Sequence, residues 1–350
     1  MKKMAIVGFG GMGHWHSEFL KSHIKELKLK GVWDVREERR TFAESLGYKA
    51  YSSLEEVLQD PEIELITVAT PNDFHKPIAI QAMRAGKNVI VEKPATLSAD
   101  DFEDMMAVAK ETGKVFTAHQ NRRWDKDYNI VKRIYNEKPI GDVYMLESRV
   151  QGSRQVMNGW RGAKINGGGM VYDWGVHLID QALDLVKSPV TQVYSQLFYI
   201  YNKEVDDNFK VMLRFENGVG YLVEISMNCF ISQPRWHIAA TNGTAEIVDW
   251  GNTGKLVRLK DNGNLGWDEK IVYTAAGPTR SMAPRPPETV EDLPLPKADP
   301  DLGEFYRNIS DAIDGKKELI VKPESVLRVL KVIDAVFESD KTGQSVKVNI

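Results

Sequence analysis

The chain has 350 residues, a length that suits two domains with a sizeable core in each. Lysine and arginine number 46 and aspartate and glutamate 49, so the formal net charge of −3 gives no reason to expect a nucleic-acid or membrane-surface partner. The single cysteine, Cys229, excludes an internal disulfide and a multi-thiolate zinc site. Because we find neither a secretory signal nor an apolar run near the ~20 residues that cross a bilayer, we expect a cytoplasmic protein.

The first third alternates between buried-strand and amphipathic-helix patterns. Strands are predicted at 3–10, 27–35, 63–72, 88–94 and 114–121. Helices are predicted at 12–25, 36–47, 52–60, 73–87 and 98–113. Ser53 and Glu56 have capping-box spacing, and Ser98 and Gly113 bracket the last of these helices. The alternation predicts an α/β domain over residues 1–122, with a doubly wound parallel sheet (a Rossmann fold) covered on both faces.

The pattern changes after a further helix at 126–138. Alternating strands are predicted at 142–152, 191–201, 209–218, 219–227, 235–243 and 244–251, with Asn-Gly turns at 217–218, 242–243 and 262–263. A helix is expected at 169–186, and the proline-rich segment 277–300 is expected to be an extended arm without regular structure. Helices at 303–315 and 323–341 and a strand at 345–350 follow. We expect a second, α+β domain over 123–350 on a large open, mostly antiparallel sheet, with the helix at about 323–340 a candidate to pack on the first domain.

The glycines in "VGFGGMG" have the spacing Gly8-x-Gly10-x-x-Gly13 between the first strand and the first helix. In a doubly wound fold this turn binds a dinucleotide pyrophosphate. Asp34 follows Gly13 by 21 residues, where a carboxylate accepts hydrogen bonds from the adenosine ribose and repels a 2′-phosphate. We therefore expect NAD rather than NADP, although Arg36, Arg39 and Arg40 lie just beyond. The predicted cofactor residues of this segment are Gly8, Phe9, Gly10, Gly11, Met12, Gly13 and Asp34.

Four further stretches strengthen this prediction: "ATPNDFH" (69–75), "VEKPA" (91–95), "HQNRRWD" (119–125) and "GGGMVYDWGVHLID" (167–180). Together with the glycine turn, the chain resembles the Gfo/Idh/MocA oxidoreductase family along essentially its whole length. Asn72 and His75 follow a strand end and are expected to line the cofactor ribose. The resemblance implies a cis Lys93–Pro94 bond and a homodimer or homotetramer formed through the second sheet. It also implies that Thr70, Pro71, Asn121, Trp160, Arg161 and Glu92 lie beside the cofactor.

Three residues are expected to carry the chemistry. Lys93 follows a buried strand at the ligand-binding edge, where it can hold a substrate hydroxyl and steady a developing charge on its oxygen. Asp173 and His177 are four residues apart and share a face of the expected helix. His177 can take a hydroxyl proton while Asp173 orients the ring or contacts the substrate, and Lys93 can also bind the cofactor. The resemblance leaves open which of Lys93 and His177 takes the proton.

The expected substrate is a sugar, cyclitol or related polyol, whose secondary hydroxyl gives its hydride to nicotinamide. Arg154, Tyr172 and Trp236 are candidate substrate contacts beside Lys93, Asp173 and His177, and each could equally be a surface or interface residue. One alternative is an enzyme that keeps NAD bound and oxidises a sugar transiently to cleave a glycoside, and another is a non-catalytic NAD sensor. His14 and His16 point to different faces of one helix, so we expect no metal site.

Overall fold

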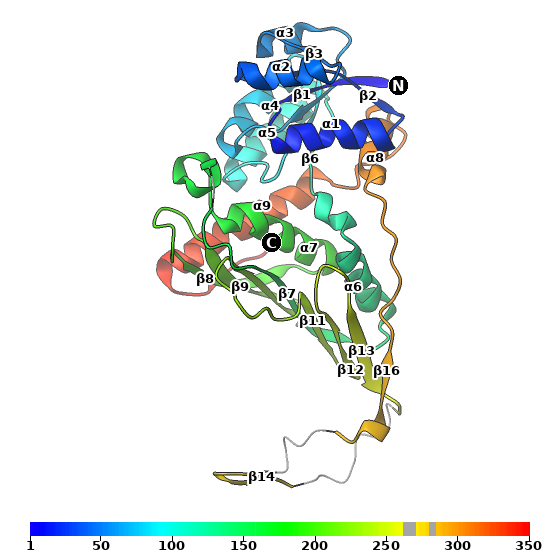
Figure 1. Cartoon of the computed structure of the whole chain (residues 1–350), viewed down its shortest axis with the longest axis vertical. Coiled ribbons are helices and arrows are strands. Elements are labelled where there is room, and N and C mark those ends of the chain that lie inside the picture. Colours follow the sequence, from blue (N-terminus) through cyan, green and yellow to red (C-terminus); the bar gives the residue numbers. More distant parts are fainter. Residues whose placement is uncertain (158, 262–270, 280–284) are drawn as a thin grey trace.

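The structure, a computed structural model, describes residues 1–157, 159–261, 271–279 and 285–350 (Figure 1). Its first part is a six-stranded parallel sheet in the order β3-β2-β1-β4-β5-β6. The strands are β1 Lys2–Val7, β2 Leu27–Trp33, β3 Lys49–Ala50, β4 Leu65–Val68, β5 Asn88–Val91 and β6 Phe116–Ala118. This sheet confirms the predicted Rossmann fold.

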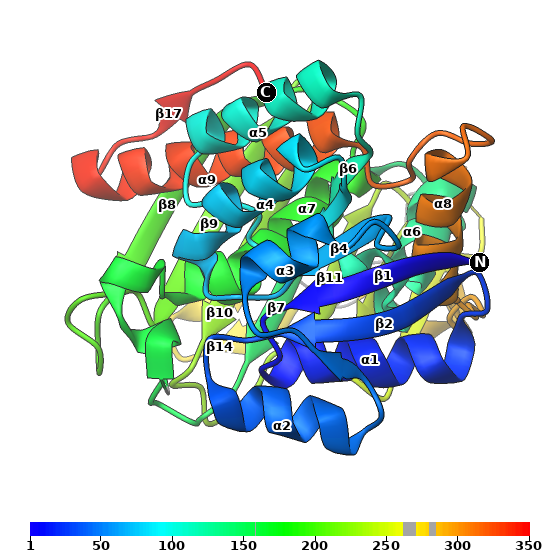
Figure 2. The ribbon, with the colours of Figure 1, turned by 90° about the horizontal axis from the view of Figure 1, so that it is seen from above.

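Helices cover both faces of this sheet. In Figure 2, α1 and α2 lie on one side and α4 and α5 on the other. The helices of this part are α1 Gly11–His23, α2 Glu37–Ser45, α3 Leu54–Gln59, α4 His75–Arg84 and α5 Ala99–Thr112. The predicted caps are confirmed, because the side chains of Ser53 and Ser98 accept the amides of Glu56 and Asp101, and Gly113 ends α5 in the left-handed conformation.

The strand register brings four chain segments to one edge of the sheet. Val7 of β1 is paired with Val68 of β4, which is paired with Val91 of β5, which is paired with Ala118 of β6. The residues that follow these four strands therefore lie in one row at the carboxyl edge, where ligands bind in open α/β sheets. In order across the sheet they are Gly8, Ala69, Glu92 and His119.

The second part is a nine-stranded mixed sheet in the order β16-β13-β12-β11-β7-β10-β9-β8-β17. Only the β7–β10 pair is parallel among the described strands of this sheet, which confirms the expected large, mostly antiparallel sheet. The strands are β7 Val143–Gln151, β8 Val190–Phe198, β9 Asn208–Phe215, β10 Gly220–Ser226, β11 Trp236–Ala240, β12 Gly243–Ile247, β13 Gly254–Leu259, β16 Val290–Leu293 and β17 Val346–Lys347.

The segment 277–300 corrects one expectation. Val290–Leu293 pairs with the open edge of β13, and β15 (Gly277–Thr279) pairs with β14 (Val272–Thr274), so the predicted lack of regular structure is wrong there. The edge of β13 offers a row of unpaired backbone groups that another strand can join. Residues 290–293 contain no proline, so their backbone N–H groups are available for this pairing. The predicted turn at Asn262-Gly263 lies outside the described residues.

Helices α6 (Lys126–Glu137), α7 (Val176–Leu185) and α9 (Pro323–Thr342) lie on one face of the second sheet (Figure 1). The apolar sides of α7 and α9 are buried there. A π-helical turn, Val171–Gly175, leads directly into α7, where a regular helix was expected from residue 169. A π-helical turn shifts the direction of the side chains that follow it, and such turns are frequent at functional sites.

The two parts are joined by the end of the chain as well as by its middle. The predicted boundary between residues 122 and 123 falls in a short 3₁₀ turn, Asn121–Trp124. Helix α8 (Gly303–Ile313) contacts β2, and α9 contacts α5 and β6 as well as α7 and β8. The carboxylate of Asp334 on α9 accepts the backbone N–H of Ala99 at the start of α5. Within the described residues, we find no helix with the length and apolar character needed to cross a membrane.

The close approach of α1 to β1 gives a first prediction. A Cβ atom on Gly13 would lie 2.1 Å from the carbonyl oxygen of Gly8, whereas one on Gly11 would have no atom within 4 Å. Gly13→Ala should therefore lower the free energy of unfolding by about 1–3 kcal/mol in urea denaturation, because helix and turn must separate. Gly11→Ala, on the same helix, is the matched control and should be close to neutral. Equal effects of the two substitutions would contradict this account.

Candidate functional site

A cavity of about 500 Å³ lies along the carboxyl edge of the first sheet. It begins beside Asp34 and the glycine turn and ends beside Lys93 and Asp173. Twelve of the predicted cofactor residues line it: Gly8, Gly10, Gly11, Met12, Asp34, Thr70, Pro71, Asn72, Glu92, Lys93, Trp160 and Arg161. The other four, Phe9, Gly13, His75 and Asn121, are not part of its described lining. The cavity thus brings together most of the predicted cofactor residues, which come from both parts of the chain.

The glycine turn is shaped to admit a ligand. Gly8 has φ +93°, and a Cβ there would lie 2.6 Å from the carbonyl oxygen of Ala69. A Cβ on Gly10 or Gly11 would instead face open space, so the turn leaves room at the start of α1, where backbone N–H groups attract phosphate. The residues present therefore fit a dinucleotide pyrophosphate. Phe9 contributes only its backbone to this turn, because its side chain is fully buried.

Asp34 is held at the end of β2 by backbone donors. The N–H of Phe9 donates to its Oδ2 at 2.7 Å and the N–H of Arg36 to its Oδ1 at 2.9 Å. The Arg36 side chain also lines the cavity, half exposed, with its Nε 3.7 Å from Asp34 Oδ1. The guanidinium of Arg40 donates to the Asp34 carbonyl oxygen instead. One carboxylate and one half-exposed cation therefore face the same end of the cavity.

Two predicted cofactor residues act on the protein itself. The side-chain amide of Asn72 donates to the Gly167 carbonyl oxygen at 2.9 Å, which ties the first part to the glycine-rich loop of the second. His75 is fully buried, and its ring nitrogens lie 2.9 Å from the carbonyl oxygens of Pro94 and Thr70. Its predicted contact with a cofactor ribose is therefore wrong in this structure, because no ring atom reaches the cavity. It holds the loop that carries Lys93, whose bond to Pro94 is cis as expected.

Lys93 and Asp173 meet across the cavity. The Lys93 ammonium donates to the Asp173 carbonyl oxygen at 2.6 Å and to its Oδ1 at 3.0 Å, and Arg161 Nε lies 3.3 Å from the same Oδ1. Burial alone raises the pKa of Asp173, but the charges of Lys93 and Arg161 outweigh it and hold this pKa below its usual 3.8. Asp173 is thus an ionised group shared by two cations.

The turn that carries Asp173 is fixed by a residue that the sequence analysis missed. Asp206 accepts the backbone N–H of Val171 at 2.8 Å. Gly169 has φ +109°, and a Cβ there would lie 2.3 Å from Asp206 Oδ1, so both the backbone angle and the space require glycine. Burial raises the pKa of Asp206 to about 7. Two adjacent aspartates just before a predicted strand, at 206 and 207, were the signal available in the sequence.

His177 lies behind the cavity wall. It is 4% exposed and packs edge-on against Trp174, with ring centroids 5.9 Å apart. Its Nδ1 has no hydrogen-bond partner among the described residues. Burial and the nearby charges of Lys93 and Arg122 hold the pKa of His177 well below its usual 6.5, so the ring is neutral. Asp173 lies in the π-helical turn and His177 in the α-helix that follows it, so the two residues are not in one regular α-helix as the sequence analysis expected.

A second cavity, of about 370 Å³, shares Arg161 and Asp173 with the first. Its other lining residues include Arg154 and Trp174 and several methionines. Tyr172 faces away: its hydroxyl donates to the Leu97 carbonyl oxygen. Of the predicted substrate contacts, Lys93, Asp173 and Arg154 therefore line one or other cavity.

Trp236 corrects the sequence analysis. It is fully buried in β11, and its indole N–H donates to Asp127 at 2.7 Å. A side chain with no exposed face cannot stack on a sugar, so the predicted substrate contact is wrong. Its place in the alternating pattern of β11, with Ile238 and Ala240 on the same buried face, was the signal that it belongs to the core.

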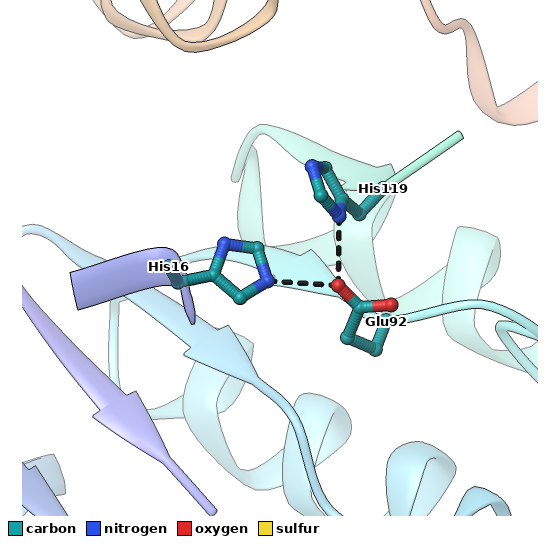
Figure 3. A group of neighbouring side chains, drawn as sticks. All are labelled: His16, Glu92 and His119. Carbon is teal, nitrogen blue, oxygen red and sulfur yellow. Dashed lines mark hydrogen bonds and ion pairs between the residues drawn. The ribbon is translucent and has the colours of Figure 1, made fainter. Parts of the chain in front are cut away.

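A buried cluster beneath Lys93 was also missed. Glu92 Oε1 accepts from His16 Nε2 at 2.8 Å and from His119 Nδ1 at 2.7 Å (Figure 3). The three side chains are close enough to be considered as a metal-binding group. Two imidazole nitrogens that both approach one carboxylate oxygen at hydrogen-bond distance make a hydrogen-bonded cluster instead, because a metal ion would stand between its ligands.

The sequences of both parts of the chain match a known family. Residues 2–120 match the family model described as an oxidoreductase family with an NAD-binding Rossmann fold, and residues 128–246 match the GFO/IDH/MocA C-terminal domain. The chain belongs to the Gfo/Idh/MocA oxidoreductase family. The predicted resemblance is therefore confirmed.

Known proteins are similar to this chain over its whole length or over a large part of it. An NAD-binding protein from Listeria innocua has a solved structure with 40% sequence identity and a TM-score of 0.95, covering 99% of this chain and 100% of its own. A scyllo-inositol 2-dehydrogenase (NADP(+)) of Bacillus subtilis is 27% identical over 98% of this chain and 95% of its own. A myo-inositol 2-dehydrogenase of Thermotoga maritima is 27% identical over 62% of this chain and 66% of its own.

Asp206 generates a stability prediction. Burial raises the folded-state pKa of Asp206 from its usual 3.8 to about 7. The protonated carboxyl group therefore contributes its full stabilisation below pH 3.8, and this contribution is lost as the pH rises through about 7. Asp206→Asn cannot ionise and keeps an acceptor for Val171. The difference in free energy of unfolding, Asp206→Asn minus wild type, should therefore increase as the pH rises, by at most about 4 kcal/mol. This difference should become constant above neutral pH. Urea denaturation at several pH values measures this. A difference that does not change with pH would contradict the raised pKa.

Proposed function

We propose that the protein oxidises a secondary hydroxyl of a sugar, cyclitol or related polyol, with NAD as the hydride acceptor, or runs the reverse reduction. The observation that carries the proposal is the convergence of Lys93 and Asp173, from the two sheets, at the end of a dinucleotide-sized cavity. The cofactor supplies the hydride chemistry, through the carbon of its nicotinamide that accepts or returns hydride. The chain supplies binding, alignment and control of one proton.

The direction of the cofactor in the cavity follows from the chemistry of its ends. Asp34 at one end suits the hydroxyls of an adenosine ribose, and the open glycine turn suits the pyrophosphate. That leaves the nicotinamide for the end beside Lys93, Trp160 and Arg161. The second cavity joins this end through Arg161 and Asp173, so we assign it to the polyol.

The chain's own groups then divide the work. The Lys93 ammonium can donate to the substrate oxygen and stabilise negative charge as the C–H bond to the carbinol carbon breaks. The neutral ring of His177 can accept the hydroxyl proton, which leaves the carbonyl product and an imidazolium. The ionised Asp173 keeps Lys93 in place and offsets that new charge. Trp174 lies between His177 and the second cavity, so proton transfer requires a small change in its position or a bridging water.

The choice of NAD rests on Asp34, whose negative charge opposes a 2′-phosphate. NADP is the second candidate, because Arg36 lines the same end of the cavity and the scyllo-inositol 2-dehydrogenase relative is named as an NADP(+) enzyme. Comparing kcat/KM with the two cofactors decides between them. We expect NAD to be preferred, and Arg36→Ala to lower activity with NADP more than with NAD.

The test of the proposal is a substrate screen. The purified protein is mixed with NAD, and separately with NADP, against a panel of cyclitols, aldoses and glycosides, while the absorbance of reduced nicotinamide is followed. We expect one polyol class to give reduced cofactor, and Lys93→Ala and His177→Ala each to lower kcat/KM by about 10²–10⁴-fold. Lys110→Ala, at an exposed site on α5, is the control and should match the wild type.

Two outcomes would count against the proposal. Breakdown of a glycoside without net formation of reduced cofactor, lost in both variants, would replace it with transient oxidation by a retained cofactor. Activity that survives both substitutions would show that the reaction centre lies elsewhere.

The neutral His177 generates a pH prediction. Because the pKa of His177 lies well below 6.5, the ring stays able to accept a proton at pH values where an ordinary histidine is charged. The acid limb of kcat/KM for polyol oxidation should therefore fall well below pH 6.5, and it should vanish from the residual activity of His177→Ala. An acid limb at or above neutral pH that remains in this variant would assign the proton to Lys93 instead.

A further inference from the structure

The hydrogen-bonded cluster at Glu92 contains one negative charge that the proposed reaction does not use. Its members come from four places in the chain: His16 on α1, Glu92 after β5, His119 after β6 and Tyr306 on α8. Glu92 is 5% exposed, and the other three side chains are fully buried. Glu92 also lines the main cavity, beside Lys93. A buried ionisable group at the reacting end of a cofactor site requires an explanation of its charge.

The hydrogen bonds assign the protons of the cluster. Tyr306 keeps its proton, because burial raises its pKa well above 10, and its hydroxyl can donate to His16 Nδ1 at 2.7 Å. His16 then donates from Nε2 to Glu92, and His119 donates from Nδ1 to the same oxygen. The Lys93 backbone N–H donates to the other oxygen, Oε2, at 3.1 Å. The Tyr306 hydroxyl also lies 3.4 Å from His119 Nε2. The two oxygens of Glu92 therefore serve as acceptors in every contact described here, as an ionised carboxylate does.

The electrostatic environment agrees with this assignment. Burial lowers the pKa of His16, so this ring carries no charge at neutral pH. Burial alone raises the pKa of Glu92, but the electrostatic effect of His119 and the hydrogen bonds from His119 and His16 outweigh it and hold that pKa well below its usual 4.5. The Glu92 carboxylate therefore stays ionised at neutral pH, and it is the member of this cluster that lines the cavity.

The other charges at this end of the cavity leave a positive excess. Lys93 and Arg161 share one carboxylate, that of Asp173, so these three side chains have a net charge of one positive unit. The nicotinamide ring is a cation when oxidised and neutral when reduced. Without Glu92, an oxidised ring would enter a region that is already positive.

We infer that the Glu92 carboxylate, held by His16 and His119, selects the oxidation state of the cofactor by stabilising the oxidised, cationic nicotinamide relative to the reduced one. The inference rests on the proposed cofactor site and its direction, and it does not depend on which polyol is the substrate. The same charge makes the bound reduced cofactor the stronger hydride donor and eases its release after oxidation of a substrate. The histidines act as positioning residues for this charge.

The experiment measures the dissociation constants of NAD⁺ and NADH by isothermal titration calorimetry for the wild type and for Glu92→Gln, with NADP⁺ and NADPH in parallel. A unit charge within ~10 Å of the ring, at an effective dielectric constant of ~20, shifts the balance by about tenfold. We therefore expect the ratio of the NADH constant to the NAD⁺ constant to fall by about tenfold in Glu92→Gln, mainly through weaker binding of NAD⁺. A purely structural role would weaken both forms alike and leave the ratio unchanged.

Asp34→Asn is the matched control, since it removes a carboxylate from the far end of the same cavity. It should change the affinity for both forms equally, because both carry the same adenosine. His119→Gln retains a donor for Glu92 and should leave the ratio near its wild-type value. A change of less than about twofold in Glu92→Gln, or an equal change in Asp34→Asn, would overturn the inference.

Two readouts keep the test decisive. If Glu92→Gln does not fold, the test uses the wild type alone. We then expect NAD⁺ to bind at least as tightly as NADH. NADH binding more than about tenfold tighter than NAD⁺ would overturn the inference. No polyol is present in these titrations. A shifted ratio together with no polyol oxidation would therefore contradict only the proposed function, whereas an unshifted ratio with polyol oxidation would contradict only this inference.

Discussion

The contact between Lys93 and Asp173 is the interaction on which the site depends. Lys93 stands at the end of a strand in the first sheet, and Asp173 on the π-helical turn above the second. The two sheets must therefore be docked before the proposed reaction centre exists. Asn72, which donates to Gly167, and Asp206, which anchors the π-helical turn, stabilise the same arrangement from either side. A site built in this way can be altered through the second sheet without disturbing the glycine turn.

Charge divides the cavity into two regions with different tasks. At the end that we assign to the adenosine, Asp34 is fixed by two backbone N–H groups, and we propose that its charge discriminates between nucleotides. At the other end, Lys93, Arg161, Asp173 and Glu92 balance one another, so a cationic ring and a polar substrate can enter without a large electrostatic penalty. His177 remains neutral because it is buried and lies near the positive charges of Lys93 and Arg122. Both regions depend on burial, which strengthens interactions between charges.

Local sequence patterns predicted the residues whose role depends on backbone position. The glycine turn, Asp34 and Lys93 each follow a strand end, and the parallel register brings these ends to one edge. Burial depth depends on packing between distant segments, so local motifs did not indicate it for His75, and for Trp236 the alternation of β11 was the available signal. Trp236 and His75 were taken for ligand contacts and are buried, and the pairing of His16 with His119 joins residues 103 positions apart. The π-helical turn escaped because helical periodicity does not reveal one inserted residue.

The most direct test of the account is a crystal structure of the protein with NAD⁺ bound. We predict that the adenosine ribose hydrogen-bonds to Asp34, that the pyrophosphate lies over Gly10 and Gly11, and that the nicotinamide lies between Glu92, Lys93 and Trp160. The reacting face of the ring should be turned toward the second cavity, next to Asp173. A nicotinamide at the Asp34 end, or a ring whose reacting face is closed off from Lys93 and Asp173, would contradict the account.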